Sequence, residues 1–167
     1  MSAHDGEKKA KLLCGKTLAA VVTSQVAKEV ARVIEVSNGQ VVPTLAVVQV
    51  GNDPASSVFI RVKQRAATEA GMRFVLKHFE GSITSADLIA AIEALNRDPS
   101  VHGILVQLPL PHHIPERVVT NAVIQSKDVD GFHLLNIGAL FRGDEPMKFL
   151  QNEFSLSPQP MLCEAYR

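Results

Sequence analysis

The sequence of 167 residues contains only two cysteines, Cys14 and Cys163, which lie near opposite ends of the chain. Because they form no Cys-x-x-Cys pair and have no clustered histidines beside them, the sequence predicts neither a disulfide framework nor a zinc site. The chain also lacks an excess of either charge, with 17 Lys and Arg against 17 Asp and Glu. This balance argues against the strongly basic surface that binds nucleic acid.

Long apolar runs are absent as well. No stretch approaches the roughly 18 uninterrupted apolar residues of a membrane helix. The first residues carry Asp5 and Glu7 and no apolar core of a signal peptide, so we expect a cytoplasmic protein in a reducing compartment. With 46% hydrophobic and 20% charged residues, the chain can bury a core, and its length favours one domain.

The hydrophobic pattern alternates between strand-like and helical segments. Strand-like runs and amphipathic stretches follow one another in regular order after a first helix, which predicts parallel pairing with right-handed crossovers. The predicted fold class is therefore α/β, a three-layer domain with helices on the faces of a parallel sheet. Helices are predicted over residues 17–36, 54–70, 84–96 and 116–124, strands over 44–51, 73–80 and 101–110, a loop over 127–132, and an irregular or partly ordered tail over 144–167.

Lys63 is an unusual residue on the helix predicted over residues 54–70. On a helical wheel it falls inside the apolar arc, with Phe59 and Ser56 within about 60° of it. Either its stem extends along the surface to reach water, or the amine loses water and can exchange a proton near neutral pH. Because an uncompensated buried ammonium is costly, a catalytic Lys63 is expected within hydrogen-bond reach of Gln107 or Ser56.

Two further polar features stand out. Gln107 interrupts an apolar strand near its carboxyl end, the side where open α/β sheets bind ligands, and it is either a structural amide or part of a site. Asp128 and Asp130 precede Gly131 and form either a turn or a carboxylate acceptor for the paired N–H groups of a heterocycle. Position twelve counted from Asp128 is Ala139, so an EF-hand is excluded and no metal site is predicted.

Three ordered motifs carry a family resemblance. They are VGNDPAS followed by a phenylalanine and a lysine (residues 50–63), VHGILVQLPLP (residues 101–111) and KDVDGFH (residues 127–133). Together they resemble the bifunctional methylenetetrahydrofolate dehydrogenase/methenyltetrahydrofolate cyclohydrolase family. The resemblance implies that residues 1–143 are the folate-binding catalytic (substrate) domain.

The resemblance also implies residue roles. Lys63 is implied as the general acid/base of the cyclohydrolase step, and Gln107 as the residue that tunes this lysine. Asp130 is implied to bind the pteridine end of the folate, with Ser56 and Phe59 as further substrate-binding residues. The implied activities are NADP-dependent oxidation of methylenetetrahydrofolate and hydrolysis of the methenyl form, in one-carbon metabolism that serves purine biosynthesis. A homodimer without a metal ion is implied as well.

The sequence departs from the family pattern in two places. Phe59 stands where the family has a tyrosine, which keeps the aromatic face and loses the hydroxyl. No Gly-x-Gly-x-x-Gly cofactor segment follows the matched region, so the family's Rossmann domain is missing from this sequence. Two hypotheses therefore stay open: an enzyme of the family with impaired activity, or a non-catalytic folate-binding or subunit-pairing fragment. Phe59 is expected either in the folate groove or in the core.

Overall fold

A computed structural model describes residues 14–143. Its three strands form one parallel sheet in the order β2-β1-β3, which confirms the predicted α/β class. The tail predicted over residues 144–167 lies outside the described residues. The elements are α1 (Gly15–Val36), β1 (Thr44–Val50), α2 (Pro54–Glu69), β2 (Arg73–Phe79), α3 (Ser85–Arg97), β3 (Gly103–Val106), α4 (Glu116–Ala122), the 3-10 turn η1 (Gln125–Lys127) and α5 (Leu134–Arg142).

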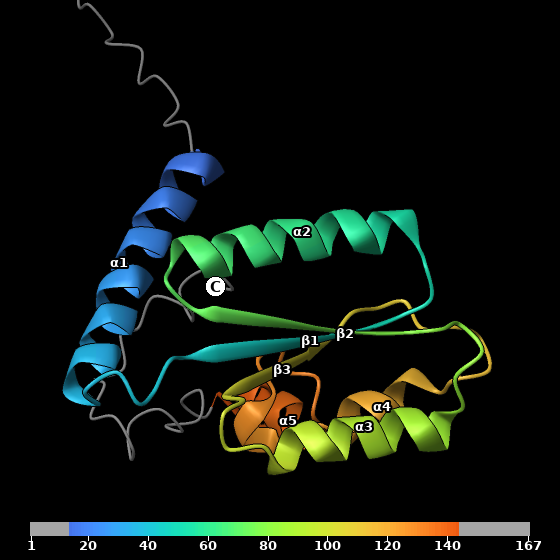
Figure 1. The fold of residues 1–167 in the computed structure, drawn as a ribbon. Helices are drawn as coiled ribbons and strands as arrows, with labels where there is room; N and C mark the ends of the chain where they lie inside the picture. The colour runs from blue at the N-terminus through green and yellow to red at the C-terminus, as the bar shows by residue number, and fades with distance from the viewer. Residues whose placement is uncertain (1–13, 144–167) are drawn as a thin grey trace, which may run out of the picture.

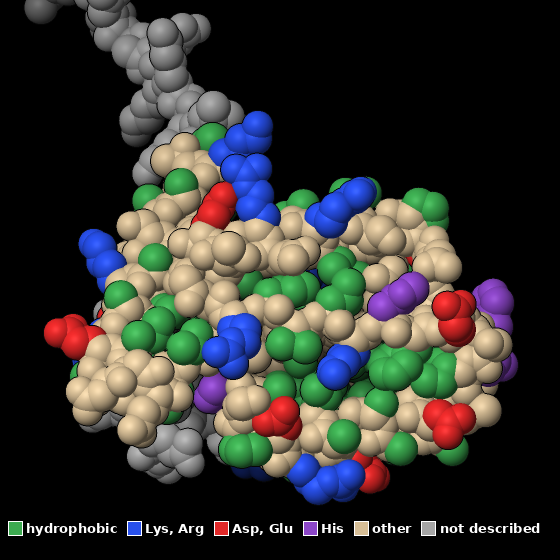
Figure 2. Space-filling view, viewed as in Figure 1, with side chains coloured by type: hydrophobic (Ala, Val, Ile, Leu, Met, Phe, Trp, Pro, Cys, Tyr) green, Lys and Arg blue, Asp and Glu red, His purple; other side chains and the backbone are tan. Residues whose placement is uncertain are grey.

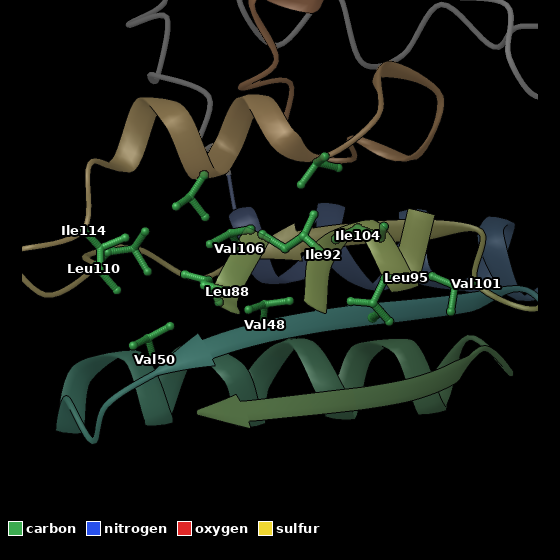
Figure 3. Packing of buried hydrophobic residues seen from close by; sticks show 13 residues of the cluster. Val48, Val50, Leu88, Ile92, Leu95, Val101, Ile104, Val106, Leu110 and Ile114 are labelled. Carbon is green, nitrogen blue, oxygen red and sulfur yellow. The ribbon is translucent and has the colours of Figure 1, made fainter. Parts of the chain in front are cut away.

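The sheet lies between two helical layers, with α2 on one face and α3 and α4 on the other (Figure 1). Successive residues of a strand point to opposite faces, so the central strand β1 supplies both interfaces. Val48 packs in the cluster formed with α3, whereas Val47 packs against Ile60 of α2. Figure 3 shows the larger cluster, in which side chains of β1 and β3 meet those of α3 and of the segment before α4.

The same alternation along β3 decides where Gln107 points. Ile104 and Val106 belong to the cluster on the α3 side, whereas Leu105 belongs to the cluster with Ile60 of α2. Gln107 follows the strand directly and its backbone N–H still donates to Val48 O at 2.9 Å. Its side chain therefore falls on the α2 side of the sheet, at the carboxyl end of the strand.

Two predicted elements are shorter than the sequence indicated. β3 spans Gly103–Val106 rather than residues 101–110, and the strand pairing cannot continue through Pro109 and Pro111, which have no N–H group to donate to a neighbouring strand. Helix α4 ends at Ala122 rather than at residue 124, and the chain then enters η1. The loop predicted over residues 127–132 is present after this turn.

Helix α5 was not predicted, although the sequence carries its end signals. The His133 side chain accepts from Leu135 N at the start, and Gly143 ends the helix with a φ of 72°. None of its residues is buried, and its apolar side chains are highly exposed, with Leu134 at 69% and Phe141 at 93%. Its apolar residues do gather on one side of the helix, but nine residues make only about two and a half turns, a short repeat for a sequence pattern to show.

The surface carries both charges. On the face shown in Figure 2, Lys and Arg side chains alternate with Asp and Glu side chains, and hydrophobic side chains reach the surface between them. Within residues 14–143, no helix is long and apolar enough to cross a bilayer. Both observations agree with the charge balance and the hydropathy of the sequence.

The loop after η1 lies along the free edge of β3. Asp128 forms a parallel bridge with Ile104, and the Val129 side chain lies over Gly103. A Cβ atom added at Gly103 would lie only 2.6 Å from Val129 Cγ1. The missing side chain of Gly103 therefore allows the loop to approach the sheet closely.

This close approach predicts a rescue between two positions. Gly103→Ala should lower the free energy of unfolding by about 1–3 kcal/mol, because the added methyl group overlaps Val129. Combining it with Val129→Ala, which removes the overlapping atom from a side chain that is 55% exposed, should restore most of the loss. Urea unfolding of the single and double variants measures this, and an equal loss in the double variant would contradict the contact.

Candidate folate site

The site begins with the N-terminus of α2, directly after β1. The Asp53 carboxylate accepts from Ser56 N at 2.7 Å, and this hydrogen bond lowers the pKa of Asp53. Pro54 occupies the first helical position, where its missing N–H has no cost. The helix therefore starts at the carboxyl edge of the sheet and places Ser56, which is 4% exposed, on its buried side.

Lys63 and Gln107 meet across the gap between α2 and β3. The Lys63 Nζ donates to Gln107 Oε1 at 3.0 Å, and both side chains are partly buried. The contact predicted from the helical wheel is therefore confirmed with Gln107 as the partner. Lys63 is neither fully exposed nor left without an acceptor for its ammonium group.

The orientation of the Gln107 amide is fixed by the backbone of the next residue. Its Nε2 donates to Leu108 O at 2.7 Å, which leaves Oε1 as the atom that faces the lysine. Ser56 Oγ donates to the same carbonyl at 3.5 Å, a long hydrogen bond that ties the start of α2 to the end of β3. Ser56 thus reaches the site through Leu108 rather than through Lys63.

The two aspartates of the loop have different surroundings. Asp128 is half-buried and accepts from Gly131 N at 3.0 Å, which matches the turn interpretation. The Asp130 side chain reaches solvent, yet the loss of water around its carboxyl group raises its pKa. The Lys63 ammonium opposes this rise in pKa, and the charge of Asp128 adds to it. Asp130 therefore lies within the electrostatic range of Lys63, and the structure brings both groups to one edge of the sheet.

Phe59 lies on the surface of α2. Its side chain is 60% exposed, so the expectation that it belongs to the core is wrong. Val58 and Val62 on the same helix are exposed as well, because only the part of the apolar arc around Ile60 and Ala67 packs on the sheet. The apolar arc of the sequence is thus wider than the buried face, and Phe59 stands in its exposed part, one turn before Lys63.

Sequence analysis missed a second buried amide beside Gln107. Gln49 is 6% exposed, and its Nε2 donates to Ser57 Oγ at 3.3 Å. It follows Val48, which pairs with Val106, so Gln49 and Gln107 are neighbours at the carboxyl ends of β1 and β3. A glutamine inside an apolar strand was the same signal that identified Gln107.

The polar groups at this edge of the sheet are an amine, amides, a hydroxyl and carboxylates. Among the described residues 14–143, no group of three His, Cys, Asp or Glu side chains is arranged to hold a metal ion. The arrangement places an amine that is held by an amide, and an exposed carboxylate, at one edge of the sheet.

Comparisons with known proteins point to one family. The sequence profile described as "Tetrahydrofolate dehydrogenase/cyclohydrolase, catalytic domain" matches residues 13–130. Bifunctional protein FolD 1 of Roseobacter denitrificans is 47% identical over 138 residues, which cover 83% of this chain and 45% of that protein. The FolD protein of Bacillus subtilis is 46% identical over 136 residues, covering 81% of this chain and 47% of that protein.

Solved structures show the same correspondence. The 5,10-methylenetetrahydrofolate dehydrogenase of the silkworm Bombyx mori aligns with a TM-score of 0.78 at 37% identity, covering 86% of this chain and 52% of that one. The dehydrogenase-cyclohydrolase of Trypanosoma brucei, complexed with NADP cofactor and inhibitor, aligns with a TM-score of 0.77 at 28% identity over 82% and 46% of the two chains. The chain spans about half the length of the relatives it matches.

The raised pKa of Asp130 predicts how a neutral replacement changes stability. The folded chain binds the Asp130 proton more tightly than the unfolded chain does, so the charged carboxylate costs stability at a pH above the raised value. Asp130→Asn should therefore raise the melting temperature near neutral pH, and the gain should vanish below about pH 3, where the carboxyl group is protonated in both states.

The matched control is Glu80→Gln, which removes an exposed carboxylate from the turn after β2. This substitution should leave the melting temperature nearly unchanged at both pH values, because it relieves no comparable loss of water. A lower melting temperature for Asp130→Asn near neutral pH would show that attraction to Lys63 outweighs the loss of water around the carboxylate.

Proposed function

This chain belongs to the tetrahydrofolate dehydrogenase/cyclohydrolase family, matching its catalytic domain, and from this we propose that it hydrolyses methenyltetrahydrofolate at Lys63. The observation that carries the proposal is the hydrogen bond of 3.0 Å from Lys63 Nζ to Gln107 Oε1 at the carboxyl edge of the sheet. Open α/β sheets bind their ligands at this edge. In the complete enzymes of the family, the same folate site would present methylenetetrahydrofolate for oxidation.

The proposed reaction needs two proton movements that a single amine can manage. Lys63 first gives up one proton to solvent. Water then adds to the methenyl carbon between N5 and N10 and loses one proton to the neutral Lys63 amine, which gives a carbinol. The bond from this carbon to N5 then breaks, the hydroxyl proton is transferred to N5 through Lys63, and the formyl group stays on N10. Positioned acid/base groups of this kind contribute about 10²–10⁴-fold to a rate.

Gln107 would hold the amine at the reacting carbon. Its Oε1 accepts a hydrogen bond from Lys63 Nζ, and its Nε2 donates a hydrogen bond to Leu108 O at 2.7 Å. These two bonds fix the orientation of the amide. A fixed acceptor restricts the lysine to one rotamer and reduces the entropy lost on reaching the transition state. This is the tuning role that the sequence resemblance implied for Gln107.

Substrate binding is proposed at Asp130, Phe59 and Ser56. The Asp130 carboxylate is exposed and can accept paired N–H groups of the pteridine ring. The exposed Phe59 ring, one turn before Lys63, offers an aromatic face to the aminobenzoate ring. Ser56 would bind the substrate near Lys63, and its hydroxyl joins the first turn of α2 to Leu108 O.

An NADP site cannot be assigned to residues 14–143, the part of the chain that the structure describes. The sequence contains no Gly-x-Gly-x-x-Gly turn, the motif that brings a backbone close to a dinucleotide pyrophosphate. NADP chemistry, which the resemblance implied, is therefore assigned to the whole enzymes of the family, and the Trypanosoma brucei relative contains this cofactor. No hydride step is assigned to the residues described above. A cytoplasmic location and a homodimer stay predictions.

The proposal predicts a specific loss of cyclohydrolase activity. Lys63→Gln should lower kcat for methenyltetrahydrofolate hydrolysis by about 10²–10⁴-fold, because the proton carrier is removed, with little change in folate affinity. Lys77→Gln, an exposed lysine on β2, is the matched control and should keep the wild-type rate. Decay of methenyltetrahydrofolate absorbance measures both, and addition of methylenetetrahydrofolate and NADP to this chain should produce no NADPH.

Two results would contradict this assignment. Equal rates for wild type and Lys63→Gln would exclude Lys63 as the proton carrier. Folate binding by the wild-type chain without any hydrolysis above the buffer rate would favour the alternative, a non-catalytic folate-binding or subunit-pairing fragment. NADPH formation by this chain alone would show that it binds NADP without a Gly-x-Gly-x-x-Gly turn.

Phe59 tests the proposed folate groove separately. Phe59→Ala should weaken folate binding by about 0.5–1.5 kcal/mol, because it removes a stacking face, while the melting temperature changes little for a side chain that is 60% exposed. Phe59→Tyr should keep both affinity and stability. Calorimetric titration with 5-formyltetrahydrofolate measures the affinity, and unchanged binding in Phe59→Ala would place the aminobenzoate ring elsewhere.

A further inference from the structure

The Asp128 carboxylate is the centre of the loop that carries Asp130. Its Oδ1 accepts from Gly131 N at 3.0 Å, while its Oδ2 accepts from His133 N at 2.8 Å and from Asn136 Nδ2 at 2.8 Å. One half-buried side chain thus binds two backbone groups of its own loop and one side chain of α5. Hydrogen bonds to a charged acceptor are about twice as strong as neutral ones.

The backbone groups that Asp128 holds lie directly beyond Asp130. Gly131 follows Asp130 and adopts a φ of 73°, a conformation that a glycine reaches without strain. The hydrogen bond from Gly131 N to Asp128 Oδ1 closes the turn around residues 129 and 130. The direction in which the Asp130 side chain leaves the loop is therefore set by Asp128.

The loop is also attached to the rest of the domain through Lys127, which precedes Asp128, and through the backbone of Asp128 itself. Lys127 Nζ donates to Leu95 O at 3.1 Å and to Asp98 O at 2.6 Å, at the carboxyl end of α3. Asp128 itself bridges to Ile104 of β3. The Asp128 carboxylate connects these anchors to Gly131 N in the turn that bears Asp130 and to Asn136 of helix α5.

We propose that Asp128 is a positioning residue for folate binding, acting through Asp130 by holding Gly131 N, His133 N and Asn136 Nδ2. The inference rests on the proposed role of Asp130 in binding the pteridine ring. The charged carboxylate is required, because all three partners are donors. An asparagine at this position has one acceptor oxygen and would turn its own NH₂ group toward a donor.

The test compares folate affinity with folding in the full chain. Asp128→Asn should weaken binding of 5-formyltetrahydrofolate by roughly tenfold per folded molecule, measured by calorimetric titration. The double variant Asp128→Asn with Asn136→Asp should recover part of this loss, because an acceptor at position 136 can bind the new NH₂ group. Asp87→Asn, which changes an aspartate that bonds Thr84 outside the site, should leave affinity unchanged.

Amide hydrogen exchange gives a second readout that needs no folate. Exchange at Gly131 and His133 should accelerate by roughly tenfold or more in Asp128→Asn and slow again in the double variant. If Asp128→Asn disrupts folding, Asn136→Ala removes one of the three donors to Asp128, together with a hydrogen bond of 3.3 Å to Gln125 O, and should show smaller changes in affinity and exchange in the same direction.

The outcomes separate this inference from the proposed function. If Asp130→Asn abolishes binding while Asp128→Asn leaves it unchanged, Asp128 is only structural and the inference is wrong. If neither substitution changes binding, the proposed role of Asp130 is wrong and the inference falls with it. Unchanged amide exchange at Gly131 and His133 in Asp128→Asn would overturn the inference whatever the folate affinity.

Discussion

The hydrogen bond between Lys63 and Gln107 is the contact on which the geometry of the candidate site depends. It joins the helix that crosses from β1 to β2 with the end of β3, which is an edge strand of the sheet in residues 14–143. It exists because a parallel sheet with alternating side chains places Gln107 on the α2 side, and because the first turn of α2 fixes where Lys63 lies on the helix. A shift of either element by one residue would separate the two groups.

The charged Asp130 carboxylate is electrostatically unfavourable in the folded chain, and hydrogen bonds elsewhere hold its loop in place. Loss of water around Asp130 raises its pKa, which means that the charged form is unfavourable there before a ligand arrives. A pteridine ring that donates two N–H groups would relieve this cost on binding. The loop can hold such a residue because Lys127 and Asp128 fasten it to α3, β3 and α5 through several hydrogen bonds. The hydrogen bonds that hold this loop thus come from residues other than Asp130.

Much of the fold could be predicted from sequence because its signals are local. The apolar runs of the strands and the Asp53-Pro54 start of α2 act within a few residues, and each corresponds to an element of the structure. The end of β3 was concealed by an apolar run that continues to Leu110, and α5 is a helix of only nine residues, which gives a short apolar repeat.

The candidate site was accessible from the sequence only in part. Lys63 and Gln107 were visible as polar residues within apolar patterns, and each needed the other as a partner. The packing of Val129 on Gly103, the donors around Asp128 and the long bond from Ser56 to Leu108 join residues whose pairing no local pattern reveals. Phe59 was ambiguous because a helical wheel shows which residues share a face, but not how much of that face is covered.

The most direct test of the folate site is a crystal structure of this chain with 5-formyltetrahydrofolate bound. We expect the pteridine ring at about 3 Å from the Asp130 carboxylate, and N5 or its formyl group within hydrogen-bond reach of Lys63 Nζ, directly or through one water. A ligand bound away from the carboxyl edge of the sheet, or one with the formyl group more than about 6 Å from Lys63 Nζ, would contradict it.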